Sequence, residues 1–329
     1  MSSFLEKTIE RARAAQKHIV LPEGSDPRTW EAAQQAAAQN IADVTVLAAP
    51  ADVPAGFVAD GVTVIDPATA DYKDELAVQL LELRQAKGMT REQADELILE
   101  PLYFGTMMVK AGYADGAVAG AVNATSAVLR AALQILKTAP NTKLVSSYFI
   151  MDVPDCEYGE GGVFLFSDCG LVENPDAEML SEIAISSAGS FEALVGKQAQ
   201  VAMLSYSTYG SAKSPLTEKV VEATRLAKEK RPDIALDGEL QLDAAIVEAI
   251  GKSKAPDSTV AGKANCLIFP DLNSGNIAYK LTERLAKAEA YGPITQGIGA
   301  PVNDLSRGCS ADDILGVIAI TAVQAADKK

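Results

Sequence analysis

Histidine and paired cysteines are scarce in this chain, which has one histidine and four cysteines among 329 residues. With His18 as the only imidazole, a Ser–His catalytic pair or a histidine-based metal site is not supported, and we interpret His18 as structural. The cysteines form no Cys-x-x-Cys pair, so reduced thiols are expected and no metal-ligand spacing is present. They are Cys156, Cys169, Cys266 and Cys309. The sequence therefore indicates no metal site.

Long apolar runs and an excess of basic charge are also absent. No segment reaches the roughly 18 apolar residues that a membrane-spanning helix needs. Residues 1–17 are amphipathic and charged, unlike a signal peptide, so we expect a cytoplasmic location. Lys and Arg number 29 against 44 Asp and Glu, which gives a formal net charge of −15. That field repels nucleic acid and anionic membranes, and neither is expected as a partner.

Nucleotide-binding fingerprints are missing as well. No Gly-x-Gly-x-x-Gly follows a predicted strand, which argues against a dinucleotide site. Gly251-Lys252-Ser253 resembles the end of a phosphate-binding loop, but Ile246 stands where the first glycine of that motif belongs. The segment also lies at the end of a predicted helix, so we do not interpret it as a nucleotide site.

Apolar segments of strand type and helix type alternate along the chain, and the hydrophobic fraction of 48% is enough for a large core. Alternation of this kind predicts an α/β fold, with two three-layer α/β/α domains built on mainly parallel sheets. Predicted strands cover 18–21, 44–47, 62–65, 116–120, 144–153, 162–166, 200–205, 234–236 and 266–269. Predicted helices cover 27–40, 71–87, 91–99, 101–111, 125–137, 177–194, 215–230, 243–250 and 276–290.

Local signals mark helix starts and a domain break. The expected helix caps are Asp26, Thr90, Ser214 and either Thr125 or Ser126. After Pro140 the sequence becomes richer in strand-type residues. We therefore expect a first domain over 1–140 and a second over 141–302. The last helix is expected to return to the first domain, which would then include 303–329.

The segment 301–313, Pro-Val-Asn-Asp-Leu-Ser-Arg-Gly-Cys-Ser-Ala-Asp-Asp, concentrates chemistry before the last predicted helix. A helix amino end attracts anions, and Arg307 adds a planar bidentate donor suited to phosphate or carboxylate. Ser306 adds a hydroxyl, and Asp313 adds a carboxylate that could act as a base. These residues predict a site for a phosphorylated small molecule. The structural alternative is that Ser310 caps the helix and Asp313 completes a capping box.

The loop 120–130 leads small residues from a strand into a helix start, with Thr125 and Ser126 at the bend and Arg130 one turn further on. Such geometry is typical of an anion-binding cradle. An ordinary capped turn is the alternative.

The loop 204–215 is rich in hydroxyls and follows a predicted strand, at the end where ligands collect in open α/β sheets. Ser207 and Thr208 are the candidate phosphate or acyl ligands there, and a polar loop without ligand is the alternative. Arg84, taken alone, is interpreted as part of a solvated helix face.

Seven stretches, in this order along essentially the whole chain, resemble the phosphate acetyltransferases (phosphotransacetylases) of the phosphate acetyl/butyryltransferase family. They are Val153–Gly159, Met203–Thr208 with Gly210–Ser214, Ile234–Leu240, Phe269–Asn273, Gly275–Lys280, Ala288–Gly297 and Asn303–Cys309. The resemblance implies reversible transfer of an acetyl group between acetyl phosphate and coenzyme A, with inorganic phosphate as the other product. It implies no permanently bound cofactor and no metal. It also implies an active site in an interdomain cleft, commonly in a homodimer.

The resemblance also implies roles for particular residues. Ser306 would hydrogen-bond the coenzyme A thiol, and Arg307 would bind acetyl phosphate and stabilise charge in the transition state. Asp313 would be the base that generates the thiolate. Arg84 and Arg130 match the arginines that contact coenzyme A in the family.

The pKa of Asp313 matters for this mechanism. A thiol with a pKa near 8.5 is mostly protonated at neutral pH, and a carboxylate with an ordinary pKa of about 3.9 is a weak base for it. Asp313 is therefore expected either to be partly buried or to act mainly by orienting the thiol. We favour direct attack by the thiolate in a ternary complex. An acetyl relay through Cys309 or Cys156 is the alternative, although Cys309 is more simply interpreted as packing the loop.

Three other functions fit parts of the pattern. A phosphate butyryltransferase would use the same chemistry with a larger acyl pocket. A catalytically inactive homologue would serve as a binding domain, but the presence of all five implied site residues argues against it. A decarboxylating dehydrogenase of related architecture would need a dinucleotide and a divalent cation, for which the sequence shows no clear site.

Overall fold

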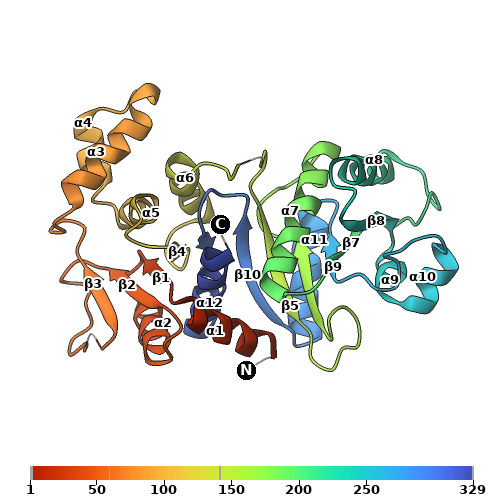
Figure 1. The fold of residues 1–329 in the computed structure, drawn as a ribbon, viewed down its shortest axis with the longest axis horizontal. Coiled ribbons are helices and arrows are strands. Elements are labelled where there is room, and N and C mark those ends of the chain that lie inside the picture. The colour runs from red at the N-terminus through yellow and green to blue at the C-terminus, as the bar shows by residue number, and fades with distance from the viewer. Residues whose placement is uncertain (1–2, 59, 141, 328–329) are drawn as a thin grey trace. The chain divides into compact units, whose positions relative to one another are not determined.

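Each half of the chain is built on its own β-sheet with helices on both faces (Figure 1). The computed structural model describes residues 3–58, 60–140 and 142–327. This part forms two units, residues 3–140 with 298–327 and residues 142–297. We propose that the two units are the domains of the chain, with boundaries near 140 and 298. The α/β fold predicted from the alternating pattern is confirmed.

The first unit has a five-stranded parallel sheet with the order β11-β4-β1-β2-β3. Its strands are β1 His18–Leu21, β2 Asp43–Leu47, β3 Val62–Ile65, β4 Gly116–Ala119 and β11 Val302–Asp304. Its helices are α1 Ser3–Ala15, α2 Pro27–Ala38, α3 Lys73–Arg84, α4 Arg91–Leu97, α5 Pro101–Ala111, α6 Thr125–Ile135 and α12 Ala311–Asp327, with a short 3₁₀ turn at Gln85–Lys87.

Helix α12 is apolar on almost every side, and the fold buries it accordingly. It packs against α1, α2 and β4, while α5 packs against α6 and α3 (Figure 1). Strand β1 is buried on both faces from Ile19 to Leu21, as central strands of parallel sheets are. Asn303 ties the last strand to α12, because its Nδ2 donates to Thr321 Oγ1 at 2.9 Å and to Gln324 Oε1 at 2.7 Å.

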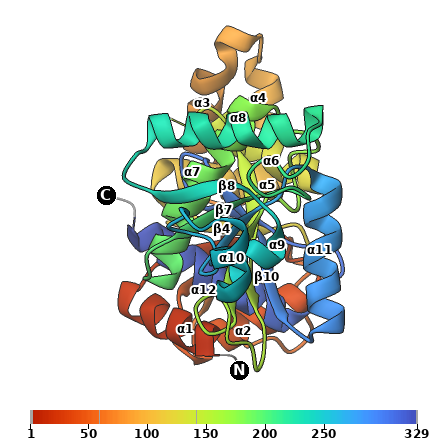
Figure 2. The same ribbon diagram turned by 90° about the vertical axis from the view of Figure 1, so that its right-hand side faces the viewer.

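The second unit has a six-stranded mixed sheet with the order β10-β5-β6-β9-β7-β8. Its strands are β5 Ser146–Asp152, β6 Val163–Ser167, β7 Gln200–Leu204, β8 Ala235–Leu240, β9 Cys266–Ile268 and β10 Glu289–Gln296. Its helices are α7 Ala177–Val195, α8 Pro215–Lys230, α9 Leu242–Ile246, α10 Glu248–Lys254 and α11 Leu272–Leu285. β5 pairs antiparallel with β6 and β10, and the other pairs are parallel. Helix α7 packs on α8 (Figure 2), and α11 lies against β5 and β10.

Three of the four expected helix caps are confirmed. Asp26 accepts from the Arg28 N–H ahead of Pro27, Thr90 forms a capping box with Gln93, and Ser214 caps α8. These helices therefore start where short-range sequence chemistry predicts.

The structure corrects the predicted end of α11, which stops at Leu285, and adds strand β10, which the sequence did not predict. Gly292 and Pro293 interrupt β10, and a proline cannot donate to a ladder. The strand tolerates them because it lies at the sheet edge, with a register shift between Tyr291 and Ile294.

Within the described ranges no helix is long and apolar enough to cross a membrane. The same ranges contain no group of three or more His, Cys, Asp or Glu side chains that could hold a metal ion.

Candidate active site

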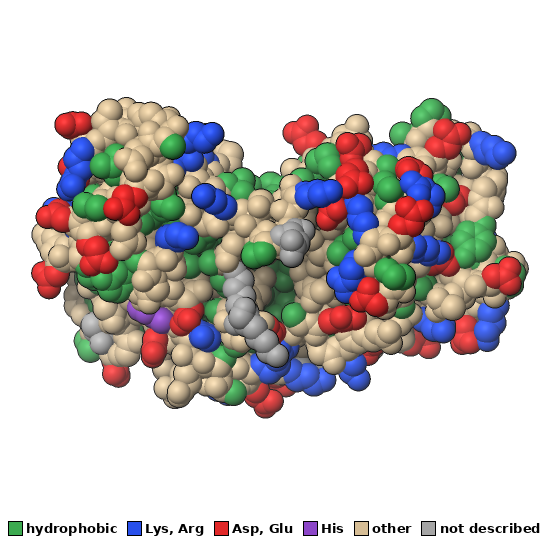
Figure 3. Space-filling view, turned by 45° about the horizontal axis from the view of Figure 1, so that its top comes forward, with side chains coloured by type: hydrophobic (Ala, Val, Ile, Leu, Met, Phe, Trp, Pro, Cys, Tyr) green, Lys and Arg blue, Asp and Glu red, His purple; other side chains and the backbone are tan. Residues whose placement is uncertain are grey.

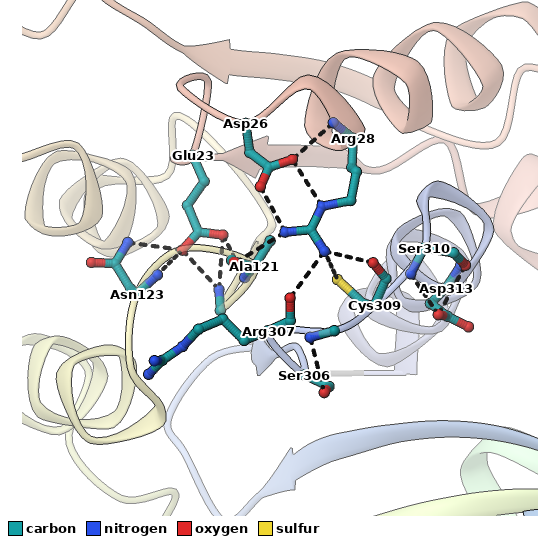
Figure 4. A network of polar contacts seen from close by, with 12 residues as sticks. Glu23, Asp26, Arg28, Ala121, Asn123, Ser306, Arg307, Cys309, Ser310 and Asp313 are labelled. Carbon is teal, nitrogen blue, oxygen red and sulfur yellow. Dashed lines mark hydrogen bonds and ion pairs between the residues drawn. The ribbon is translucent and has the colours of Figure 1, made fainter.

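The candidate site lies at one edge of the first sheet, where the neighbouring strands β11, β4 and β1 end. β11 ends at Asp304 and leads into the 305–310 turn, which begins α12. β4 leads into the 120–124 loop, and β1 is followed two residues later by Glu23. Because parallel strands run in one direction, segments far apart in sequence meet here (Figure 4).

Arg28, in the first turn of α2, holds the 305–310 turn in place. Its Nη1 donates to the carbonyl oxygens of Arg307 at 3.0 Å and Cys309 at 2.6 Å, and its Nη2 donates to the Ala121 carbonyl at 3.1 Å. Asp26 accepts from Nε at 2.9 Å and from Nη2 at 2.6 Å, which fixes the plane of the guanidinium and lowers the pKa of Asp26. One planar donor thus joins three segments (Figure 4).

The 120–124 loop does form a cradle for an anion, but the anion is the chain's own Glu23. This carboxylate, only 4% exposed, accepts from the N–H groups of Gly120, Ala121 and Asn123 at 2.8–3.0 Å. The Asn123 side-chain Nδ2 donates to it as well, at 2.8 Å. Three backbone donors of this loop are therefore occupied within the protein, and they tie the loop to the end of β1.

The start of α6 differs from the sequence prediction. Neither Thr125 nor Ser126 is the cap; the N-cap residue is Ala124, which has no side-chain acceptor. The Thr125 hydroxyl instead donates to Asp304 Oδ2 at 2.6 Å, which explains why it does not cap its own helix. Ser126 and Arg130 are exposed on the first turns of α6. These first turns thus keep N–H groups that no side chain caps.

Asp304 is a buried carboxylate beneath the 305–310 turn, with 1% of its surface exposed. Its Oδ2 accepts from Thr125, and its Oδ1 has no hydrogen-bond partner in the part of the chain that the structure describes. Burial raises its pKa to about 6, and the nearby charge of Glu23 acts in the same direction. The Thr125 bond, the adjacent Leu305 N–H and the charge of Arg307 oppose the rise.

Ser306, Arg307 and Asp313 lie exposed on the turn and on the first turn of α12. Arg307 directs its carbonyl to Arg28 and its guanidinium away from it (Figure 4). The capping alternative for Asp313 is confirmed: its Oδ2 accepts from Ser310 N at 2.7 Å and Ser310 Oγ at 2.9 Å, and Ser310 Oγ accepts from Asp313 N. The partial burial considered for Asp313 is not observed, which favours an orienting role.

Cys309 packs the inside of the turn. It is 7% exposed, and burial raises the pKa of its thiol against the opposing charge of Arg28. Its position is that of a packing residue rather than an activated nucleophile. Cys156 belongs to the second unit, where it packs partly buried against the hydrophobic core.

Arg84 lines a pocket of about 570 Å³ in the first unit. Its Nε is buried and without a hydrogen-bond partner among the described residues, so Arg84 is not simply a solvated helix residue. Tyr103 in the same pocket donates to Gln134 Oε1 at 3.1 Å, and burial raises its pKa against the charges of Arg130 and Arg84. The pocket thus combines basic, aromatic and amide groups with the carboxylates of Glu96 and Glu100, so an anionic ligand would be attracted by Arg84 and Lys87 in particular.

Ser207 and Thr208 lie in the second unit, and both are buried. Ser207 Oγ donates to Glu239 Oε1 at 2.8 Å, and Thr208 Oγ1 accepts from Gln241 N at 2.9 Å. The two hydroxyls thus support their own loop, and a contact with substrate stays a prediction for them.

The sequence did not point to three residues that organise this edge: Glu23, Arg28 and Asp304. A signal was available for each. Glu23 and Asp304 stand at the carboxyl ends of strands, where ligand-binding groups gather in α/β sheets. Arg28 lies in the first turn of the helix that Asp26 caps, within reach of the loops at that edge.

A model of the phosphate acetyl/butaryl transferase family matches residues 3–322. The chain belongs to this family. A phosphate acetyltransferase from Acetivibrio thermocellus is 64% identical to it over 98% of each chain. One from Thermoanaerobacterium thermosaccharolyticum is 54% identical, over 98% of this chain and 99% of its own. The crystal structure of a phosphotransacetylase from Streptococcus pyogenes superposes with a TM-score of 0.91 and 41% identity, covering 100% of both chains.

These comparisons confirm the family that the seven sequence stretches predict, and with it a transferase. The phosphate on which this family acts is an anion, whereas the chain itself has a net charge of −15. On the face shown in Figure 3, basic and acidic side chains are interspersed on each unit rather than separated by sign. Local arginines such as Arg307 and Arg84, rather than a broad basic surface, are therefore the expected attraction for an anionic substrate.

Proposed function

We propose that the chain catalyses reversible transfer of an acetyl group between acetyl phosphate and coenzyme A. The observation that carries the proposal is the 64% identity with a relative named phosphate acetyltransferase over 98% of each chain. The site supports it, because an exposed arginine and hydroxyl stand on a turn that Arg28 holds rigid. Preorganised donors of this kind stabilise charge without reorganisation during the reaction.

In the direction of acetyl-CoA synthesis, the thiol of coenzyme A gives up its proton and its sulfur attacks the acetyl carbonyl carbon. A C–S bond forms, the bond from the carbonyl carbon to the phosphate oxygen breaks, and phosphate leaves with that electron pair. Arg307 binds the phosphoryl group and offsets the negative charge that develops. One such donor contributes about 3–4 kcal/mol to transition-state stabilisation.

Asp313 receives the thiol proton in this proposal, and Ser306 orients the sulfur by a hydrogen bond. The two described bonds to Asp313 both reach Oδ2, so Oδ1 is the oxygen that we propose accepts from the thiol. Because Asp313 is exposed, its contribution is mainly orientation, and proximity of the two bound substrates supplies the rest of the acceleration.

Arg84 and Arg130 bind the anionic groups of coenzyme A in this proposal, with the pocket around Arg84 as one contact region. Thr125, Ser126, Ser207 and Thr208 are further candidate contacts for the phosphate or acyl group. We also propose that the chain acts as a cytoplasmic homodimer. No metal and no permanently bound cofactor are required for these steps.

The direct test is thioester formation from acetyl phosphate and coenzyme A, followed by ultraviolet absorbance. Wild type should turn over, and Arg307→Ala should lose about 100- to 1000-fold in kcat/KM. Arg91→Ala is the matched control, since Arg91 is an exposed arginine that pairs with Asp95 on α4. An Arg307→Ala enzyme as active as Arg91→Ala would remove Arg307 from the mechanism, and an inactive wild type would mark a binding domain.

The acyl range needs its own comparison, because the matched family covers both acetyl and butyryl transfer. Acetyl phosphate and butyryl phosphate should be assayed side by side, and the ratio of kcat/KM values reports the fit of the acyl pocket. We expect acetyl phosphate to be preferred. A higher value for butyryl phosphate would reassign the chain to butyryl transfer.

A further inference from the structure

Two buried carboxylates, those of Glu23 and Asp304, flank Gly120 at the site edge. Glu23 binds the Gly120 N–H with both oxygens, at 3.0 and 2.9 Å. A Cβ at Gly120 would lie 2.4 Å from Asp304 Oδ1, so that oxygen packs directly on the glycine. The two acids differ in their donors: Glu23 accepts from four N–H groups, whereas the Thr125 hydroxyl is the side-chain donor to Asp304 within the described ranges.

Asp304 connects the two elements that carry the proposed substrate-binding arginines. Through Thr125 it holds the first residue of α6, the helix on which Arg130 stands. Through the chain it precedes Arg307 by three positions, and the charge of Arg307 acts on it. A negative Asp304 would therefore hold the start of α6 and attract the Arg307 turn at the same time.

We propose that Asp304 is a positioning residue for acetyl transfer, which sets the spacing between α6 and the 305–310 turn as long as its carboxylate is ionised. The proposal rests on the proposed roles of Arg307 and Arg130. Proton uptake removes the charge that attracts Arg307 and weakens the bond from Thr125, because a hydrogen bond to an ion is stronger than one to a neutral acid. Transfer then falls with pH as Asp304 becomes neutral.

The groups around Asp304 determine the pH at which its carboxylate becomes neutral. Burial raises its pKa to about 6, and Glu23 from the β1 end adds to the rise. Thr125 from α6, the Leu305 N–H and the charge of Arg307 from the turn oppose it. Proton uptake is therefore expected close to neutral pH, well above the range of an exposed aspartate.

The test compares wild type with Asp304→Asn, an uncharged side chain of the same shape. The ratio of their kcat/KM values is measured from pH 5 to pH 8, because the ionisation of the substrates cancels in the ratio. We expect a ratio of roughly 10 to 100 at pH 8, which falls toward one with a midpoint near pH 6. A ratio that stays constant with pH would overturn the proposal. Asp233→Asn, an exposed aspartate whose pKa is lowered to about 2, should give a constant ratio.

Thr125→Val separates positioning from direct substrate contact. Loss of the Thr125 hydroxyl should move the acid limb of the activity profile to higher pH, because that bond stabilises the ionised Asp304. A uniform loss of rate without a shifted midpoint would indicate a substrate contact by Thr125 and contradict the proposed link.

A readout independent of activity is NMR of protein labelled with ¹³C at the aspartate carboxyl carbons. One resonance, missing from Asp304→Asn, should titrate with a midpoint near 6. If that resonance titrates but wild type shows no transfer, the proposed function fails. If wild type is active and the resonance keeps the midpoint of an exposed aspartate, the inference about Asp304 fails.

Discussion

The guanidinium of Arg28 donates to the backbone carbonyl of Arg307 at 3.0 Å, so one arginine positions another without touching its side chain. The contact fixes the peptide and leaves the Arg307 guanidinium directed away (Figure 4). Arg28 is therefore expected to affect catalysis through geometry alone.

Arg28→Lys keeps the positive charge but lacks the planar fork that reaches three carbonyls and Asp26. We expect kcat to fall by roughly 10- to 100-fold and the free energy of unfolding to fall by about 1–3 kcal/mol. Steady-state kinetics and urea denaturation measure the two effects, with Arg91→Lys as the control. Unchanged kcat in Arg28→Lys would mean that the turn does not need this contact.

Gly120→Ala should be poorly tolerated. The φ of Gly120 is +117°, and an added Cβ would lie 2.4 Å from Asp304 Oδ1 and 2.4 Å from Leu305 N. We expect destabilisation of at least about 3 kcal/mol together with loss of activity. Gly112→Ala separates strain from collision, since Gly112 also has positive φ (+83°) but no neighbour within 4 Å of an added Cβ; it should cost about 1 kcal/mol. Equal losses in the two variants would contradict the close packing around Gly120.

Cys309→Ala should retain most of its turnover, because burial raises the pKa of Cys309 and keeps it a thiol at neutral pH. A change of only a few-fold in kcat is expected, together with about 1 kcal/mol of stability lost from packing. Initial rates beside those of Arg307→Ala provide the measure. A loss as large as that of Arg307→Ala, with the fold intact, would favour an acetyl-cysteine relay instead.

Ionisation of Asp304 should also change the free energy of unfolding with pH. Its pKa in the fold, about 6, lies above the ordinary value of 3.8, so the folded chain binds an extra proton between these values. Stability from this group is therefore present below pH 4 and is lost as pH rises through 6. The difference in unfolding free energy between wild type and Asp304→Asn should fall by about 2–3 kcal/mol from pH 4 to pH 7.

Urea denaturation at several pH values measures that difference, and Asp233→Asn again serves as the control. No change in the difference across this range would indicate that Asp304 has the same pKa in the folded and unfolded chain.

The features that the sequence predicts correctly depend on residues that lie close together in the chain. Asp26, Thr90 and Ser214 act on N–H groups two or three residues away, so their caps depend on local sequence alone. Apolar periodicity likewise predicts the buried strands of the first sheet, because both faces of a parallel sheet are covered.

Long-range partners explain what the sequence does not predict. Thr125 fails as a cap because it bonds Asp304, which lies 179 positions later in the chain. Glu23 fills the loop expected to hold an anion, across 97 to 100 positions. Strand β10 accepts Pro293 because it lies at an edge, which no window of neighbouring residues reveals. Only the resemblance to the family, which rests on stretches along the whole chain, pointed to Arg84.

The strand order has a consequence for biosynthesis. β11, which carries Asp304, pairs with β4, although all of residues 142–297 separates the two in sequence. A growing polypeptide on the ribosome can thus bring Glu23 to Gly120 early, but it cannot complete this sheet until the intervening half has been translated. Acyl-transfer competence would then appear only after β11 has been translated, and a product that stops before Val302 would keep an unpaired edge at β4.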